Sequence, residues 1–328
     1  MAKYTASKRN IWIKRAILFS IFLVLAIGVS LVAGYLFVEY FQPSPVSTQA
    51  EKKTLGVTET VSSIELEEYE KIVKEETEIY KGPLILVNNQ NLYQFTEEEE
   101  LVSVLEEKQE DYQVSDRTVK VNQMVMEPLD KMIRDFQQET GFRDLLVASG
   151  YRSKELQSSL FEREAQAKGE QEASLWVAQP GGSEHHTGYG MDFSIYTSQG
   201  VSLDYTGTGE CSWLNQNCYQ YGFVVRFPED KEELTGIDYE PWHFRYVGIP
   251  HAYMMTKNNL CLEEYISFLK QYPFDQQHLD VQDEQGNRYV IYYVKSQGEK
   301  TEVPVPKEQE YDISGNNQDG FIVTVKQA

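Results

Sequence analysis

The stretch GGSEHHTGYGMDFSIY, residues 181–196, joins a glycine-rich turn, two adjacent histidines and a single aspartate. Met191, Phe193 and Ile195 recur at every second position, which is the period of a β-strand. Asp192 therefore lies on the face of that strand opposite these apolar side chains. An acidic side chain in a strand that follows such a turn normally has a cationic partner, so we expect this stretch to contribute to a site.

A second candidate segment, DYEPWHFRYVG at residues 238–248, places Glu240 three residues before His243. Either segment alone is weak evidence, because a lone histidine and an isolated Glu-x-x-His are usually structural. Together they supply the imidazole and carboxylate ligands of hydrolytic zinc sites, where three protein ligands leave one position for water. Two histidines and one aspartate satisfy that count, and a further glutamate beside the open position could move a proton between water and leaving group.

Strand and helix patterns are interspersed along the chain without a regular βαβ rhythm, which indicates an α+β fold. Apolar residues at helical spacing end at Gly141, a typical C-terminal cap, and Ser153 begins a second helical pattern that ends before Gly169. We expect strands at 83–87, 144–150, 191–196, 222–227 and 242–248, and helices at 121–140, 153–168, 209–221 and 261–272.

The N-terminal region contains an apolar run, residues 16–38, without a charged side chain. As a helix it would span roughly 35 Å at about 1.5 Å per residue, enough for a hydrocarbon core of about 30 Å. Lysines and arginines precede it, so the positive-inside rule places residues 1–15 in the cytoplasm and the rest of the chain outside. A cleaved signal peptide is the alternative, although its apolar region is normally shorter, about 7 to 15 residues. We expect a single-pass membrane anchor.

Composition divides the rest of the chain into three further segments. Residues 39–81 are rich in Ser, Thr, Pro and acidic residues, and we expect a linker or stalk whose last part is an acidic amphipathic helix or unstructured. Residues 82–275 carry the strand and helix patterns of the main domain. Residues 276–328 contain three short strand-like runs, which form either a small β appendage or edge strands added to the main sheet.

Charge and cysteine content exclude some function classes. The formal net charge is −21, so no basic surplus is available to displace counterions from phosphates, and we expect no nucleic-acid partner. Cys211 and Cys218 fall in a helix-like segment, where two turns separate them by about 10 Å, too far for a disulfide. No Cys-x-x-Cys spacing occurs, so inert buried thiols are expected instead of a metal site.

Three blocks carry a specific resemblance: SGYRSKELQ at 149–157, GGSEHHTGYGMDF at 181–193 and YGFVVRFPEDKEELTGIDYEPWHFRYVG at 221–248. They resemble the signature blocks of the VanY-type D-alanyl-D-alanine carboxypeptidases, zinc peptidases that share their fold with the hedgehog signalling domain. The similarity runs from about Gly82 to Tyr272. The family pattern around the first ligand is Ser-x-His-x-x-Gly-x-Ala-x-Asp, and here Gly190 replaces the usual alanine. Loss of one methyl group in a tight turn should be tolerated.

The resemblance implies a role for each matching residue. His185, Asp192 and His243 would bind one zinc ion. Glu240 would be the general base and acid. Arg152 would bind the substrate and stabilise the developing oxyanion, a task suited to a fixed bidentate donor. Gln157 and Ser183 resemble substrate-contacting polar positions of the family.

The remaining aromatic and histidine residues receive no chemical role. Trp242 should pack beside the ligands, and His251 and His278 match no ligand position. In an extended chain adjacent side chains point in opposite directions, so His185 and His186 should not both reach one metal. The family pattern does not restrict His186, and we place it at the cleft rim.

These expectations describe a membrane-anchored, outward-facing zinc carboxypeptidase at the cell surface, acting on peptidoglycan stem peptides that end in D-Ala, with no obligate protein partner. An L,D-carboxypeptidase that trims tetrapeptide stems is the nearest alternative, because it would share all three blocks. A D,D-dipeptidase of the cytoplasmic kind is disfavoured by the anchor. A non-catalytic zinc-containing peptidoglycan-binding module is the alternative from another class, but a structural zinc site does not need Glu240 beside the metal.

Overall fold

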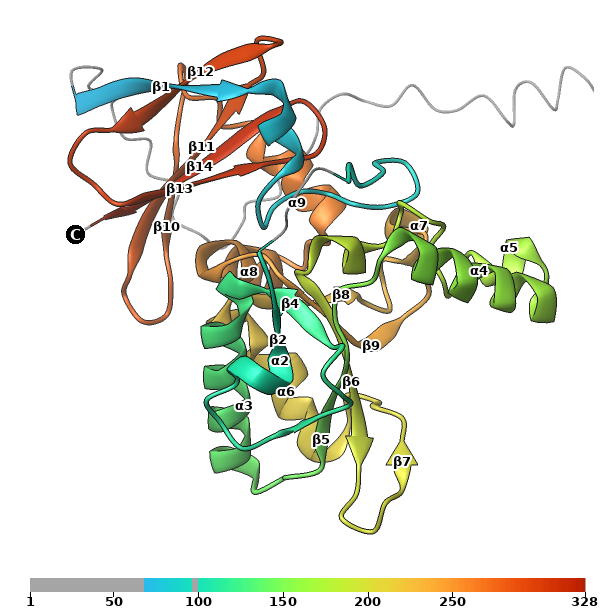
Figure 1. Ribbon diagram of the computed structural model, residues 1–328. Coiled ribbons are helices and arrows are strands. Elements are labelled where there is room, and N and C mark those ends of the chain that lie inside the picture. Colours follow the sequence, from blue (N-terminus) through green and yellow to red (C-terminus); the bar gives the residue numbers. More distant parts are fainter. Residues whose placement is uncertain (1–67, 96–99, 328) are drawn as a thin grey trace, which may run out of the picture. The chain divides into compact units, whose positions relative to one another are not determined.

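The computed structural model describes residues 68–95 and 100–327 (Figure 1). The expected anchor at residues 16–38 and most of the expected linker lie outside the described residues. Within the described ranges, no helix is both long and apolar enough to cross a membrane. Strands and helices are mixed as the sequence predicts, so the α+β class is confirmed.

The main sheet has the strand order β3-β5-β6-β9-β8, with the short strand β7 paired to β6. Only β3 and β5 are parallel, and the other pairs are antiparallel. The strands are β3 (Gln113–Val114), β5 (Leu145–Ser149), β6 (Gly190–Tyr196), β7 (Ser202–Leu203), β8 (Phe223–Phe227) and β9 (Glu240–Tyr246). β6 and β9, which carry the two candidate segments, are therefore neighbours in the middle of the sheet.

Helix α3 (Met126–Thr140) covers the sheet with its apolar face. Leu129, Ile133 and Phe136 are fully buried and pack in one core cluster with Met191 of β6. The helix ends at residue 141, a glycine with φ +73°, as the sequence predicts. It begins later than expected, because residues 123–125 form a 3-10 turn.

The predicted helix at 209–221 is divided into the 3-10 turn Gly209–Cys211, helix α6 (Ser212–Asn217) and the 3-10 turn Cys218–Tyr221. All three cysteines of the chain are buried and unpaired, as expected. Burial raises the pKa of Cys211 to about 11 and that of Cys218 to about 12, which makes both thiols inert.

The C-terminal segment forms a sheet of its own with the order β10-β11-β14-β13, so the appendage alternative is correct. Its strands are β10 (Leu279–Gln282), β11 (Arg288–Lys295), β13 (Tyr311–Gly315) and β14 (Gly320–Gln327), all antiparallel to their neighbours. Helices α8 (Ile249–Lys257) and α9 (Leu262–Leu269) pack against it, with Met254 and Ile266 in one apolar cluster with Ile291 and Ile322.

The expectation of a stalk up to residue 81 is wrong for its last part. Strand β1 (Tyr69–Glu75) pairs antiparallel with β12 (Lys300–Pro306), and the two strands run side by side in Figure 1. A 3-10 turn, Glu76–Tyr80, follows β1 and buries Ile79. The local composition of this strand is acidic and does not indicate a strand. Its pairing partner lies more than 200 residues further along the chain.

The expected strand at residues 83–87 is also wrong, although this segment is buried. Side chains from other parts of the fold form hydrogen bonds with its backbone, which is not paired with a neighbouring strand. The guanidinium of Arg245 donates to the carbonyls of Pro83 and Ile85, each at 2.9 Å, and Ser314 Oγ accepts from the N–H of Leu84. The apolar run is therefore a buried connection, not a strand.

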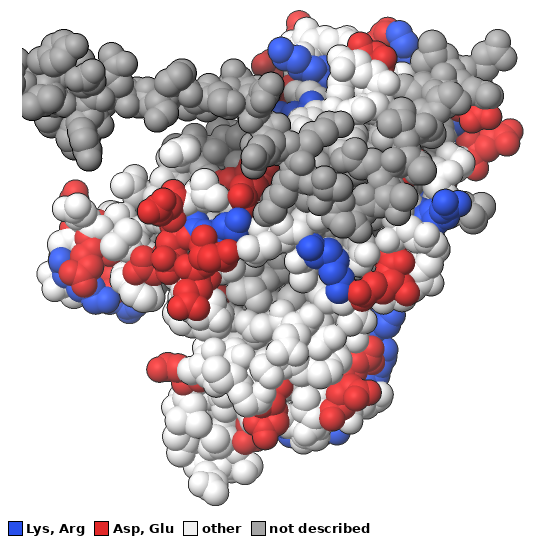
Figure 2. All heavy atoms as spheres, turned by 180° about the vertical axis from the view of Figure 1, so that it is seen from behind, with Lys and Arg blue, Asp and Glu red and all other residues white. Residues whose placement is uncertain are grey.

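The surface carries the acidic excess. Asp and Glu side chains form several separate clusters on the face shown in Figure 2, with fewer basic side chains between them. This agrees with the interpretation that most of the net charge is solvated and does not indicate a substrate.

Candidate metal and active site

The pairing of β6 with β9 places Asp192 directly opposite His243. His185 comes from the 3-10 turn η4 (Glu184–Thr187), immediately before β6. Gly188 ends this turn with φ +71°, and a Cβ there would lie 2.9 Å from the backbone nitrogen of Asn122. Only glycine fits this reversal, which brings the histidine back over the strand that carries the aspartate.

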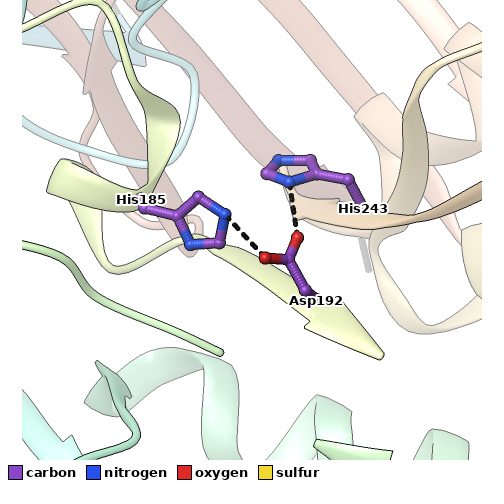
Figure 3. Close-up of side chains that lie close together, drawn as sticks. All are labelled: His185, Asp192 and His243. Carbon is purple, nitrogen blue, oxygen red and sulfur yellow. Dashed lines mark hydrogen bonds and ion pairs between the residues drawn. The ribbon is translucent and has the colours of Figure 1, made fainter. Parts of the chain in front are cut away.

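The three predicted ligands converge (Figure 3). His243 Nδ1 lies 2.9 Å from one carboxylate oxygen of Asp192, and His185 Nε2 lies 3.2 Å from the other. One ligand atom from each residue can be chosen so that all three lie within 4.8 Å of one another. Among the described residues, no other group of His, Cys, Asp and Glu side chains has this geometry.

The protonation pattern of the two adjacent histidines decides which one is a ligand. His185 Nδ1 lies 2.6 Å from the carbonyl of Gly150, which only accepts, so the lone pair is on Nε2, facing Asp192. His186 Nδ1 donates to the carbonyl of Arg152 at 2.7 Å, and its Nε2 accepts from the N–H of Gly181 at 3.1 Å. Both nitrogens of His186 are occupied, so it is not a ligand, as predicted.

The location expected for His186, at the cleft rim, is wrong. Its ring is fully buried and packs against Tyr93 and Phe95. Because its Nδ1 binds the carbonyl of Arg152 while His185 binds that of Gly150, the two histidines together hold the turn that carries Arg152. One histidine therefore faces the site, and its neighbour supports the arginine.

The electrostatics suit a divalent cation. Burial lowers the pKa of His185 to about 4, so its imidazole is neutral. Burial opposes ionisation of Asp192, but the neighbouring His185 and Arg152 outweigh it and hold the pKa of this carboxyl well below its usual range. Burial would also lower the pKa of His243, yet the carboxylates of Asp192 and Glu184 raise it to about 9. A bound cation takes the place of that proton.

Glu240 lies at the first residue of β9, beside the three ligands. Its Oε2 is 3.9 Å from His243 Nδ1, and the side chain is almost fully buried. Burial raises the pKa of Glu240 to about 7, and the carboxylate of Asp192 contributes to the same shift. This is a carboxyl group that can both accept and release a proton near neutral pH.

Arg152 follows β5 and points into the same site. Its Nη2 lies 2.5 Å from Asp192 Oδ2, and its Nε donates to Ser149 Oγ at 3.1 Å. These two bonds fix the plane of the guanidinium, as required of a residue that positions a substrate.

A cavity of about 300 Å³ connects these groups. Gln157, the buried residue of α4 (Lys154–Lys168), lines it and donates its amide N–H to the carbonyl of Ala178 at 2.8 Å. The Oε1 of Gln157 has no hydrogen-bond partner among the described residues, so it is an acceptor available to a ligand. Every site residue predicted from the sequence lines this cavity: Arg152, Gln157, Ser183, His185, Asp192, Glu240 and His243.

The residues without an assigned role also lie as expected. Trp242 packs against the main core cluster and forms part of the cavity wall. His251 is buried between Tyr265 and Thr324, and His278 stacks on Tyr292 with ring centroids 4.5 Å apart. These two histidines are structural.

Sequence reasoning missed Glu184, the residue before His185. It is buried beside Arg226 of β8 and Arg245 of β9, and one of its oxygens approaches His243. A signal was present, because an arginine among the apolar residues of β8 and a second one in β9 require a buried acidic partner.

The family model for VanY, D-alanyl-D-alanine carboxypeptidase, matches residues 118–249. A D-alanyl-D-alanine carboxypeptidase of Enterococcus faecium is 34% identical over 262 residues, which are 78% of this chain and 78% of that protein. The crystal structure of the vancomycin-resistance D,D-dipeptidase VanXYg, in complex with a D-Ala-D-Ala phosphinate analogue, is similar with a TM-score of 0.70. It is 33% identical, and the match covers 79% of this chain and 99% of that chain.

A mutant of the D,D-pentapeptidase VanY from a VanB-type resistance cassette, solved in complex with Zn(II), is 34% identical over 56% of this chain and 98% of that chain, with a TM-score of 0.47. The segment matched by the family model contains every residue of the site described above.

Proposed function

The chain belongs to the VanY family of D-alanyl-D-alanine carboxypeptidases, and from this premise we propose that it is a zinc carboxypeptidase that removes the terminal D-Ala of peptidoglycan stem peptides. One observation carries the proposal. Three ligand atoms of His185, Asp192 and His243 lie within 4.8 Å of one another, and the separate carboxylate of Glu240 stands 3.9 Å from one of them.

The residues present fit one zinc ion. Two neutral imidazole nitrogens and one carboxylate are a typical ligand set of catalytic zinc, which keeps a further position for water or substrate. His185 would bind through Nε2 and His243 through Nδ1, the nitrogens that face Asp192. When bound, zinc supplies a Lewis acid that lowers the pKa of a water molecule to near neutrality.

Glu240 moves the proton. It accepts one from the water that attacks the carbonyl carbon of the penultimate residue, and it delivers the same proton to the amide nitrogen of D-Ala as the C–N bond breaks. The pKa of about 7 that burial gives Glu240 suits both halves of this transfer. No covalent bond between enzyme and substrate is needed, so acylation of a serine by β-lactams should not inhibit the protein.

Arg152 and Gln157 bind the substrate. The guanidinium of Arg152, held by Ser149 and Asp192, presents positive charge to the oxygen that becomes negative in the tetrahedral intermediate. The Oε1 of Gln157, which no described residue pairs, can accept an N–H of the peptide. Ser183 lines the same cavity and contributes a hydroxyl group to its wall.

The proposal is tested with the full chain and two synthetic stems. Pentapeptide ending in D-Ala-D-Ala and tetrapeptide ending in D-Ala are incubated with and without a zinc chelator, and products are followed by mass. Loss of one alanine from the pentapeptide, stopped by the chelator, supports the D,D-activity. Loss from the tetrapeptide alone supports the L,D alternative, and loss from neither supports the binding module.

We also propose that residues 16–38 anchor the protein in the cell membrane, with the catalytic domain outside. The uncharged apolar run and the basic residues before it support this topology. Protease added to intact cells should digest the catalytic domain. Complete protection in intact cells, followed by digestion after lysis, would reject the outward orientation.

A further inference from the structure

A buried cluster of charges lies behind His243, on the side of its ring away from Asp192. Glu184, Arg226 and Arg245 have 3%, 1% and 0% of their surfaces exposed. Arg226 Nε donates to Glu184 Oε1 at 2.7 Å, and Arg245 Nη1 lies 2.8 Å from the same oxygen. Both arginines therefore pair with Oε1 of Glu184, and neither pairs with its Oε2.

That second oxygen, Oε2, lies 3.7 Å from Nε2 of His243. Both atoms are buried, and neither has a hydrogen-bond partner among the described residues. A separation of 3.7 Å exceeds a hydrogen bond, but a carboxylate at this distance in a buried site still attracts a proton strongly. A carboxylate only accepts, so Nε2, which faces Glu184, carries a proton. Nδ1 faces the carboxylate of Asp192, and there a bound zinc ion would take the place of the proton.

The arginines prevent Glu184 from turning away. Arg226 continues to Glu263 of α9 through two bonds of 2.7 and 3.0 Å, and Arg245 is fixed by the carbonyls of Pro83 and Ile85. Rotation of the Glu184 side chain would remove one of the two carboxylates bonded to Arg226 and would leave the buried Arg245 without an acidic partner among the described residues, which is strongly unfavourable. The residues of β8, β9 and α9 that hold the two arginines therefore fix the orientation of Oε2 toward His243.

We propose that Glu184 is a positioning residue that keeps the proton of His243 on Nε2 and thereby presents the lone pair of Nδ1 to the zinc ion. The inference rests on the proposed metal site and adds to it a residue outside the ligand set. It also explains why the residue adjacent to one ligand, His185, is a buried glutamate: the same turn supplies one ligand and orients another.

The substitution Glu184→Gln tests this without changing side-chain size. The two arginines require the amide oxygen of the glutamine on their side, so the NH₂ group must face His243. This NH₂ group should donate to Nε2 of His243 and move the ring proton to Nδ1, the atom needed for the metal. Zn²⁺ affinity of the full chain, measured by competition with a chromogenic chelator, should fall about 10- to 100-fold, the range for substitutions that orient metal-binding histidines.

Glu263→Gln is the matched control. It removes the same charge from the same cluster, at a residue bonded to Arg226 but not facing a ligand. Zinc affinity of Glu263→Gln should stay close to that of the wild type, even though the protein loses stability. Equal weakening of zinc binding by both variants would overturn the inference, as would a folded Glu184→Gln protein that binds zinc like the wild type.

A spectroscopic measurement on the zinc-loaded wild type covers the case in which Glu184→Gln does not fold. Nitrogen-15 NMR of the histidine side chains should show the ring proton of His243 on Nε2, and a proton on Nδ1 would overturn the inference. Neither readout depends on D-Ala release. A protein with this tautomer and no activity would refute the proposed function alone, whereas an active protein with zinc affinity insensitive to Glu184→Gln would refute the inference alone.

Discussion

Gly190 opens β6 two residues before Asp192, and its replacement by alanine should stabilise the protein while leaving the metal site intact. The backbone there is not in the left-handed region. An added Cβ would lie 3.4 Å from the carbonyl carbon of Glu184 and from two ring atoms of His243, at the limit of ordinary van der Waals contact. The methyl group therefore fits against the ring with little movement of its neighbours.

Two effects set the magnitude. Alanine in place of glycine reduces the freedom of the unfolded chain, worth about 0.4–1 kcal/mol where the native backbone is compatible. Burial of the methyl group adds about 0.8 kcal/mol. The melting temperature should rise by about 2–7 °C, since 1 kcal/mol corresponds to about 2–4 °C in domains of this size.

Gly150→Ala is the matched control, because the same substitution there should have the opposite sign. A Cβ on Gly150 would lie 2.1 Å from the carbonyl oxygen of Lys120, which accepts the N–H of Tyr151. The backbone has to move at a cost of about 1–3 kcal/mol. The carbonyl of Gly150 holds His185, so zinc binding should weaken as well.

The assay compares thermal unfolding by circular dichroism and zinc affinity for the wild type, Gly190→Ala and Gly150→Ala. A lower melting temperature for Gly190→Ala, or a loss of zinc affinity in that variant, would refute the packing argument around His243. The family's preference for alanine at this position would then have a different cause.

Three further predictions follow from the site and the core. His185→Ala should abolish zinc binding, whereas His186→Ala should keep the metal and cost about 1–3 kcal/mol through unpaired backbone groups; zinc content and chemical unfolding of both variants decide this. Glu240 is active as the carboxylate, and burial places its pKa at about 7 before a cation lowers it. The ratio kcat/KM should therefore fall as the pH drops below the pKa of this group, and a constant value from about pH 5 to about pH 8 would contradict its role as base. The native protein should react slowly with a thiol-specific disulfide reagent at pH 8, because burial raises the pKa of Cys218 to about 12, and all three thiols should react after denaturation; a fast-reacting native thiol would contradict this.

The three metal ligands were predictable from the sequence because short-range sequence patterns identify them. Strand periodicity places Asp192 away from the apolar face, and the three signature blocks select His185 and His243. The structure adds the physical reason for the choice between the adjacent histidines, since both nitrogens of His186 are used by backbone groups. Sequence could not place Glu240, because Pro241 interrupts the alternation of the strand.

Long-range pairing accounts for what the sequence did not reveal. Residues 69–75 are acidic and locally resemble a stalk, and only their distant partner strand makes them part of a sheet. The apolar run 83–87 looks like a strand but is held by the side chains of Arg245 and Ser314. Glu184 escaped notice because its partners come from two other strands.

The most direct test of the central claim is D-Ala release by Glu240→Gln with zinc occupancy verified in the same sample. Glu240 lies beside the ligands without belonging to them, so the variant should retain the metal. We expect release from a pentapeptide stem to fall by about 10²- to 10⁴-fold, the usual contribution of a general acid–base group. Release at the wild-type rate by the zinc-loaded variant would contradict this expectation.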